Sequence, residues 1–242
     1  MYRNLILSIS VLALATSNLR AQAHNANADE VIARMLGRDR ESHSSLDGYT
    51  AWRRYVLENV RYHKRAEMLV RVKCLEDGSK EFETVSSDGW GIARHHVFPR
   101  LLAAETDASQ PGLRERSRVI PENYSFQMTG TDIVNGRPAY VIAVTPKTSN
   151  RYLIKGKVWV DAEEYAIVRI EGQPAKRPSF WTKSVHFVHT YAKQGQFWFP
   201  LSDESVTDVR ILGDTDLKIE YFGYLPNAPA TSLAEASERR LP

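Results

Sequence analysis

The histidines are the residues whose type and spacing could bind a metal ion. His95 and His96 are adjacent, so their rings point in different directions on a helix or on a strand. His186 and His189 are three residues apart, which places them on opposite faces of a strand. A zinc site needs three or four convergent ligands. We therefore expect no metal site and no cofactor, with His186 in solvent and His189 on the same face as Phe187.

The carboxylates and the single thiol give little support for catalysis. Acid–base chemistry needs paired carboxylates in a pocket, but three pairs that are adjacent only in sequence lie at predicted turns or element ends: Asp29-Glu30, Glu163-Glu164 and Asp203-Glu204. The sequence contains neither a G-x-S-x-G elbow nor a phosphate-binding glycine loop. Cys74 alternates with apolar residues, which predicts a small buried side chain rather than a nucleophile. We expect a protein that is not an enzyme.

The first residues have the pattern of a secretory signal peptide. Arg3 precedes an apolar run at residues 5–15, and Ala21-Gln22-Ala23 forms an A-x-A cleavage site. The run is too short to span a bilayer, which takes about 20 residues. Cleavage after Ala23 would make His24 the first residue and leave no lipid-attachment cysteine there. We expect a soluble periplasmic or secreted protein, with an uncleaved anchor as the alternative.

Charge and length limit the remaining possibilities. Residues 1–23 carry two arginines and no acid, so their removal lowers the formal net charge from +3 to +1. A nearly neutral chain without a basic stripe argues against a nucleic-acid partner. One cysteine permits no intramolecular disulfide. We predict a signal peptide at residues 1–23, one domain at 24–225 and a flexible tail at 226–242.

Two segments have helical patterns. Asn27 and Glu30 form a capping-box pattern ahead of an apolar face, and Gly37 is a plausible stop, so we predict a helix over residues 28–36, with an extension toward 41 left open. A second, shorter helix is predicted over residues 99–105, because Pro99 suits a first helical turn and apolar residues flank it.

Most of the chain from Tyr49 onward alternates with a period of two. Glu76-Asp77-Gly78-Ser79, Asn135-Gly136 and Gln194-Gly195 are hairpin-turn sequences. Close spacing with hairpin turns predicts antiparallel neighbours, one face of which can remain in water. The later strands are predicted at 124–134, 139–145, 152–161, 165–171, 184–193, 197–199, 202–212 and 216–224.

Trp159 is predicted to share a sheet face with Lys155, Lys157 and Asp161, opposite Val158 and Val160. Two interpretations stay open for this exposed tryptophan. It provides ordinary cover for one side of the sheet, or it contacts a partner or a helix that covers that face.

Three short motifs carry a resemblance to a known family. They are Ser87-Asp88-Gly89-Trp90, Val97-Phe98-Pro99-Arg100-Leu101-Leu102, and the paired segments Gly136 to Pro146 with Arg151-Tyr152 and Trp159-Val160-Asp161. With the element order, these motifs resemble the outer-membrane lipoprotein-sorting, or lipoprotein-localisation, superfamily, which includes carriers, acceptors and a sigma-factor regulator. The resemblance implies a mainly β fold with minor α: a strongly curved antiparallel half-barrel, an N-terminal helix and an inserted lid helix.

The resemblance also implies a function and a set of site residues. An apolar trough in the sheet would hold the acyl chains of a lipid or acylated lipoprotein, and the carrier would be a monomer that meets a protein of the inner or outer membrane. Arg53 and Arg54 are the candidates for the arginine that latches the lid. A sensor, regulatory or structural interaction module of the same fold is the alternative. The implied trough is Met68, Val70, Val72, Ile142, Val144, Ile154, Val158 and Val160, and the implied lid is Val97, Phe98, Leu101 and Leu102.

Overall fold

The computed structural model describes residues 27–150, 152–176, 182–209 and 213–227. The predicted signal peptide and its cleavage site lie outside the described residues, as do Arg151 and most of the predicted tail. No helix among the described residues is both long enough and apolar enough to cross a membrane.

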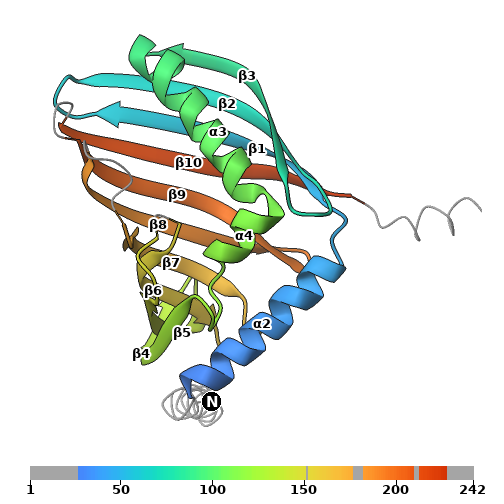
Figure 1. Ribbon diagram of the computed structural model, residues 1–242. Helices are drawn as coiled ribbons and strands as arrows, with labels where there is room; N and C mark the ends of the chain where they lie inside the picture. Colours follow the sequence, from blue (N-terminus) through green and yellow to red (C-terminus); the bar gives the residue numbers. More distant parts are fainter. Residues whose placement is uncertain (1–26, 151, 177–181, 210–212, 228–242) are drawn as a thin grey trace, which may run out of the picture.

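Ten strands form one antiparallel sheet in the order β3-β2-β1-β10-β9-β8-β7-β6-β5-β4. The sheet is strongly twisted and curved, and the helices lie on one of its faces, which we call the concave face (Figure 1). This arrangement confirms the predicted fold class. The strands are β1 (Tyr49–Asn59), β2 (Lys64–Cys74), β3 (Lys80–Gly89), β4 (Tyr124–Val134), β5 (Arg137–Pro146), β6 (Ile154–Asp161), β7 (Ile167–Pro174), β8 (Thr182–Gln194), β9 (Phe197–Val209) and β10 (Gly213–Pro226).

The first helix, α2 (Ala28–Ser44), is longer than the predicted 28–36. Gly37 does not stop it, because an interior glycine costs only about 1 kcal/mol relative to alanine. The turns before and after Gly37 both hold tertiary contacts: Met35 is buried, and Arg38 donates to the carbonyl of Gln196 at 2.9 Å. Packing therefore outweighs the local signal.

The inserted helical segment is also longer than the predicted 99–105. It begins with a π-helical turn (Ala93–Val97), continues as α3 (Phe98–Ser109) and ends with α4 (Pro111–Ser117). Pro99 does lie in the first turn of α3. The break at Gln110 follows from Pro111, since the residue before a proline is driven into an extended conformation.

Among the strand boundaries that differ from the predictions, two have a clear physical reason. The predicted strands 197–199 and 202–212 are one strand as far as Val209, β9, because Pro200 lies at a register shift between β8 and β9 where a bulge tolerates proline. Residues 210–212 lie outside the described residues. The strand predicted from residue 165 begins at Ile167, because Tyr165 has a φ of +58° and ends the preceding turn. The Asn135-Gly136 hairpin is as predicted, with φ angles of +50° and +78°.

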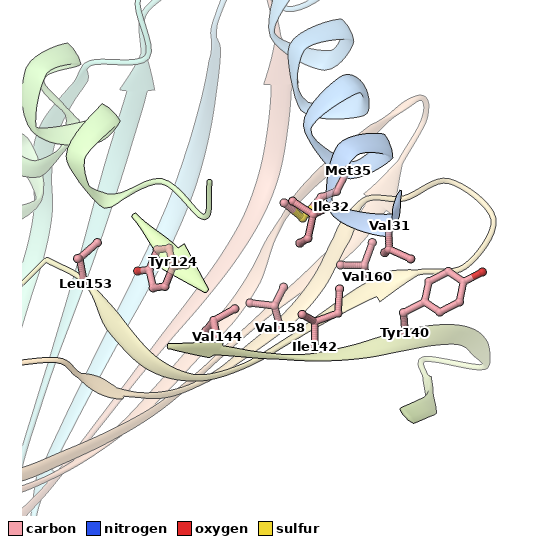
Figure 2. Close-up of a cluster of buried hydrophobic side chains, with 10 residues drawn as sticks. All are labelled: Val31, Ile32, Met35, Tyr124, Tyr140, Ile142, Val144, Leu153, Val158 and Val160. Carbon is pink, nitrogen blue, oxygen red and sulfur yellow. The ribbon is translucent and has the colours of Figure 1, made fainter. Parts of the chain in front are cut away.

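Two of the apolar clusters on the concave face lie beneath helices. One lies over β4–β7, where Val31, Ile32 and Met35 of α2 point toward the strands (Figure 2). The other lies over β1–β3 and β10, beneath the π-helical turn and α3. Each half of the sheet therefore has its own covering helix.

Trp159 is not the exposed residue that alternation predicts. It lies on the opposite, convex face, but only 7% of its surface is exposed. It packs in a cluster with Ala139, Val141 and Val168. Its indole N–H donates to Asp132 at 3.0 Å, and the Arg169 guanidinium lies 5.0 Å from its ring centroid. The polar neighbours cover the ring instead of leaving it in solvent.

Candidate functional site

The structure divides the predicted trough into two groups. Met68, Val70 and Val72 of β2 form what we call the α3 floor, because they belong to the cluster beneath α3. The other residues form the α2 floor, in the cluster beneath α2. All of them are buried except Ile154, which is partly buried. The α2 floor consists of Ile142, Val144, Ile154, Val158 and Val160.

The four predicted lid residues all pack on the α3 floor. Phe98 is buried, and its ring lies edge-on to Tyr55 with centroids 6.4 Å apart. Val97, Leu101 and Leu102 are partly buried against the same cluster. The lid therefore meets the three β2 residues of the predicted trough, while α2 covers the other five.

A buried ion pair fastens α3 to the sheet. Arg53 of β1 is 2% exposed, and its guanidinium donates to the carboxylate of Glu105 on α3. The hydroxyl of Tyr55 donates to the other oxygen of Glu105 at 3.0 Å. We call this group the latch. Arg54 points to the other side of the sheet and pairs with Glu220 at 2.8 Å, so of the two candidate arginines only Arg53 contacts the lid helix.

Aromatic rings surround the Arg53 guanidinium. It lies 4.6 Å from the ring centroid of Tyr221 and 5.3 Å from that of Phe82. Burial alone would lower the pKa of Arg53, but Glu105 and the neighbouring tyrosine hydroxyls outweigh it and hold that pKa well above its ordinary value. The latch arginine is therefore charged at every physiological pH.

Polar contacts continue from the latch across the middle of the concave face. The hydroxyl of Tyr221 on β10 donates to Asp203 on β9, and the other oxygen of Asp203 pairs with His189 on β8. Burial raises the pKa of Tyr221 well above its ordinary value, with Asp203 adding to the effect. The His189 and Phe187 rings lie 4.8 Å apart, as the shared face predicts.

A cavity of about 690 Å³ lies between α2, α4 and the middle strands. None of the predicted trough or lid residues lines it. A sequence signal for this cavity exists in the arginines of two helices. Arg38 and Arg40 lie on α2, which is longer than predicted, and Arg114 lies on α4, which was not predicted. The lining residues are Met35, Leu36, Arg38, Asp39, Arg40, Ser42, Ser44, Arg114, Arg118, Val119, Tyr165, Ala166, Ile167, Tyr191 and Trp198.

Two of the four arginines of the cavity have carboxylate partners. Arg118 pairs with Asp39 at 2.7 Å and with Glu115 at 3.0 Å. Arg38 lies 3.9 Å from Glu164. Arg40 and Arg114 form no ion pair with any residue that the structure describes. The cavity therefore has an excess of positive charge.

The other sequence candidates for chemistry lie apart from this region. Cys74 is buried as predicted, and burial raises the pKa of its thiol. His186 is exposed, 3.5 Å from Glu171. Over the described residues, no three His, Cys, Asp or Glu side chains are grouped so that they could hold a metal ion.

Comparison with known proteins identifies the class of this fold. Residues 63–173 match the family described as the MucB/RseB N-terminal domain. The matched segment runs from the end of the β1–β2 turn to β7, and so includes the α3 floor and the complete lid. The resemblance to the lipoprotein-localisation superfamily that the sequence motifs indicate is confirmed. No curated protein matches the chain.

Several solved structures are similar to the chain at low identity. A putative outer-membrane lipoprotein-sorting protein domain from Vibrio parahaemolyticus is 13% identical, with a TM-score of 0.49 over 88% of this chain and 100% of that one. A LolA superfamily protein from Nitrosomonas europaea is 9% identical, with a TM-score of 0.39 over 86% and 97%. The Pseudomonas aeruginosa MucA/MucB complex gives 12% identity and a TM-score of 0.26 over 84% and 100%.

Proposed function

We propose that this protein is a periplasmic module that binds the acyl chains of a lipid or an acylated lipoprotein on its concave face. The family and fold are those of binding, carrier or regulatory modules rather than of known enzymes. The observation that carries the proposal is a concave face that is apolar at both ends and holds a cavity of about 690 Å³ between its helices. Ligand pockets typically measure about 300–1,000 Å³.

The α3 helix acts as a lid that a ligand displaces. It covers the α3 floor through Phe98, Leu101 and Leu102, and the latch is its buried polar attachment. An acyl chain that takes its place regains about 0.8 kcal/mol for each buried methylene. The chain gives up a similar free energy when it leaves a membrane, so transfer is nearly balanced and the lid keeps the affinity moderate.

The proposed periplasmic localisation is supported by the same family comparison. The MucB/RseB and lipoprotein-localisation families are periplasmic. The signal-peptide pattern of residues 1–23 supports export of this chain, which we propose to be released as a monomer.

A regulatory module that binds a protein segment is the second candidate, and the MucB/RseB family match favours it. Such a module would use the same floor and the same lid. It differs from a lipid carrier in what displaces the lid, so ligand identity separates the two functions.

A fluorescent fatty-acid probe tests the proposed function. We expect saturable binding to the wild-type protein and competition by unlabelled fatty acid. Leu102→Ala removes a lid contact and is expected to raise probe affinity, because the lid then competes less well for the floor. Arg53→Gln loosens the latch and is expected to do the same.

Arg54→Gln is the matched control, since Arg54 is adjacent in sequence but lies on the other face of the sheet. It should leave probe affinity unchanged. Absence of saturable binding in every variant, with circular dichroism showing an intact fold, would reject acyl-chain binding and leave the protein-binding module as the better account.

A further inference from the structure

We propose that the cavity between α2 and α4 selects single-chain amphiphiles whose headgroup is anionic. Its arginines would hold a headgroup phosphate or carboxylate, and its apolar wall would hold the first part of the chain. This inference rests on the proposed function and names the class of ligand that the concave face accepts.

The apolar wall of the cavity continues the α2 floor. Met35 belongs to the buried cluster, and Leu36, Val119 and Ile167 pack against that cluster while also lining the cavity. Trp198 adds an aromatic surface. An acyl chain that enters here would therefore meet the same apolar core that α2 covers.

The charged wall has more cations than anions. Arg38 and Arg40 come from α2, and Arg114 and Arg118 come from α4 or the residue after it. Asp39 is the only carboxylate among the described lining residues, and Arg118 already pairs with it.

Glu164, which does not line the cavity but lies 3.9 Å from Arg38, is also neutralised. The carboxylate of Glu164 forms ion pairs with Lys193 at 2.7 Å and with Arg137 at 3.3 Å, and it accepts a hydrogen bond from the indole N–H of Trp198 at 3.1 Å.

Arg40 therefore remains as a guanidinium group without a carboxylate partner among the described residues. Arg114 forms no ion pair with them either, but its guanidinium lies against Gly78, beside Asp77, whose pKa is lowered by hydrogen bonds from Ser79 and also by Arg114.

This arrangement distinguishes headgroups by charge. Guanidinium groups bind phosphate and carboxylate through paired, charge-assisted hydrogen bonds. A zwitterionic choline headgroup brings a quaternary ammonium toward the same arginines, which is unfavourable. The volume of the cavity, about 690 Å³, suits one chain with its headgroup rather than a bulky multi-chain lipid.

The test is isothermal titration calorimetry with two lysolipids of equal chain length, each below its critical micelle concentration. Lysophosphatidylglycerol is anionic, and lysophosphatidylcholine is zwitterionic. We expect the anionic lipid to bind at least about tenfold more tightly, which corresponds to about 1.4 kcal/mol, and the difference to shrink at high salt.

The variants identify the arginines responsible. Arg40→Gln combined with Arg114→Gln should abolish the preference, because the anionic lysolipid then binds more weakly. Arg116→Gln is the matched control, because Arg116 lies on the same helix as Arg114, is exposed and does not line the cavity.

Each other outcome overturns the proposal. Equal affinity for the two lysolipids, or a preference that survives the double variant, removes the headgroup site while acyl-chain binding stands. Inorganic phosphate that binds as tightly as the anionic lysolipid shows an anion site without a chain site. If neither lysolipid binds to the folded protein, the proposed function fails together with this inference.

Discussion

Arg53 of β1 and Glu105 of α3 form a buried ion pair across the interface between the sheet and the lid helix. The arginine is almost completely enclosed, while the side chain of the glutamate is 28% exposed at the helix surface. Because Arg53 is the more deeply buried partner, loss of Glu105 leaves a buried positive charge without its counter-charge.

The first prediction concerns the latch. Glu105→Gln leaves the Arg53 charge buried without a counter-charge, so the free energy of unfolding should fall by about 3 kcal/mol. Urea unfolding measures the change. Glu83→Gln, which breaks the exposed pair between Arg71 and Glu83, is the control and should cost less than about 1 kcal/mol.

A paired substitution separates charge from packing at the same place. Arg53→Met combined with Glu105→Leu removes both charges, and apolar replacement of a buried pair is often neutral or stabilising. We expect the double variant to recover most of the stability that Glu105→Gln loses. A double variant no more stable than Glu105→Gln would show that the pair does not act through its charge.

The second prediction concerns pH and Asp161, which accepts from Arg137 at 2.6 and 2.9 Å and from the backbone N–H groups of Glu163 and Glu164. Burial would raise the pKa of Asp161, but these donors outweigh burial and hold it below its ordinary value. The stability from this carboxylate is therefore complete above the ordinary pKa, about 3.9, and is lost as the pH falls through the lowered value.

Asp161→Asn should accordingly lower the free energy of unfolding at pH 7 by about 2–3 kcal/mol, and the gap to the wild type should narrow below about pH 4. Unfolding curves at several pH values measure both. Asp216→Asn, at an exposed position of β10, should have little effect at any pH. A gap for Asp161→Asn that does not depend on pH would contradict the assignment.

The third prediction concerns Trp159 and Asp132. The indole N–H of Trp159 is the largest cause that lowers the pKa of Asp132, followed by the backbone N–H of Ile133. Trp159→Phe removes that donor, so the pKa of Asp132 should rise toward its ordinary value. Carboxyl chemical shifts in an NMR titration report the pKa, and Trp90→Phe is the control that should leave it in place.

The fourth prediction concerns export. The A-x-A pattern at Ala21-Gln22-Ala23 predicts cleavage that makes His24 the first residue. Mass spectrometry of the exported protein measures the terminus. A chain that retains Met1, or one with a lipid-modified terminus, would contradict a released periplasmic protein.

The strand pattern and its turns could be predicted from sequence because they depend on local rules. Alternation placed Met68, Val70 and Val72 on one face, and Asn135-Gly136 specified a tight hairpin. The helix ends could not be predicted in this way. Gly37 is tolerated within α2 because the residues on both sides of it pack against the rest of the fold.

The division of the site also depends on tertiary structure. Alternation assigns Val70 and Val158 to apolar strand faces, but it does not reveal that different helices cover them. Trp159 shows the same limit, because Arg169 and Asp132 enclose a ring that alternation places in solvent. Sequence patterns do not reveal the cavity, because its arginines come from segments that are adjacent only in the folded protein.

Amide hydrogen exchange of α3 during ligand binding tests the central claim most directly. If an acyl chain takes the place of the lid on the α3 floor, amides of α3 (Phe98–Ser109) should exchange faster in the protein saturated with fatty acid than in the free protein, because the helix loses its packing. Amides of β2, which remain within the sheet, should not exchange faster. Saturated binding with unchanged or slower exchange in α3 would contradict a lid that the ligand displaces.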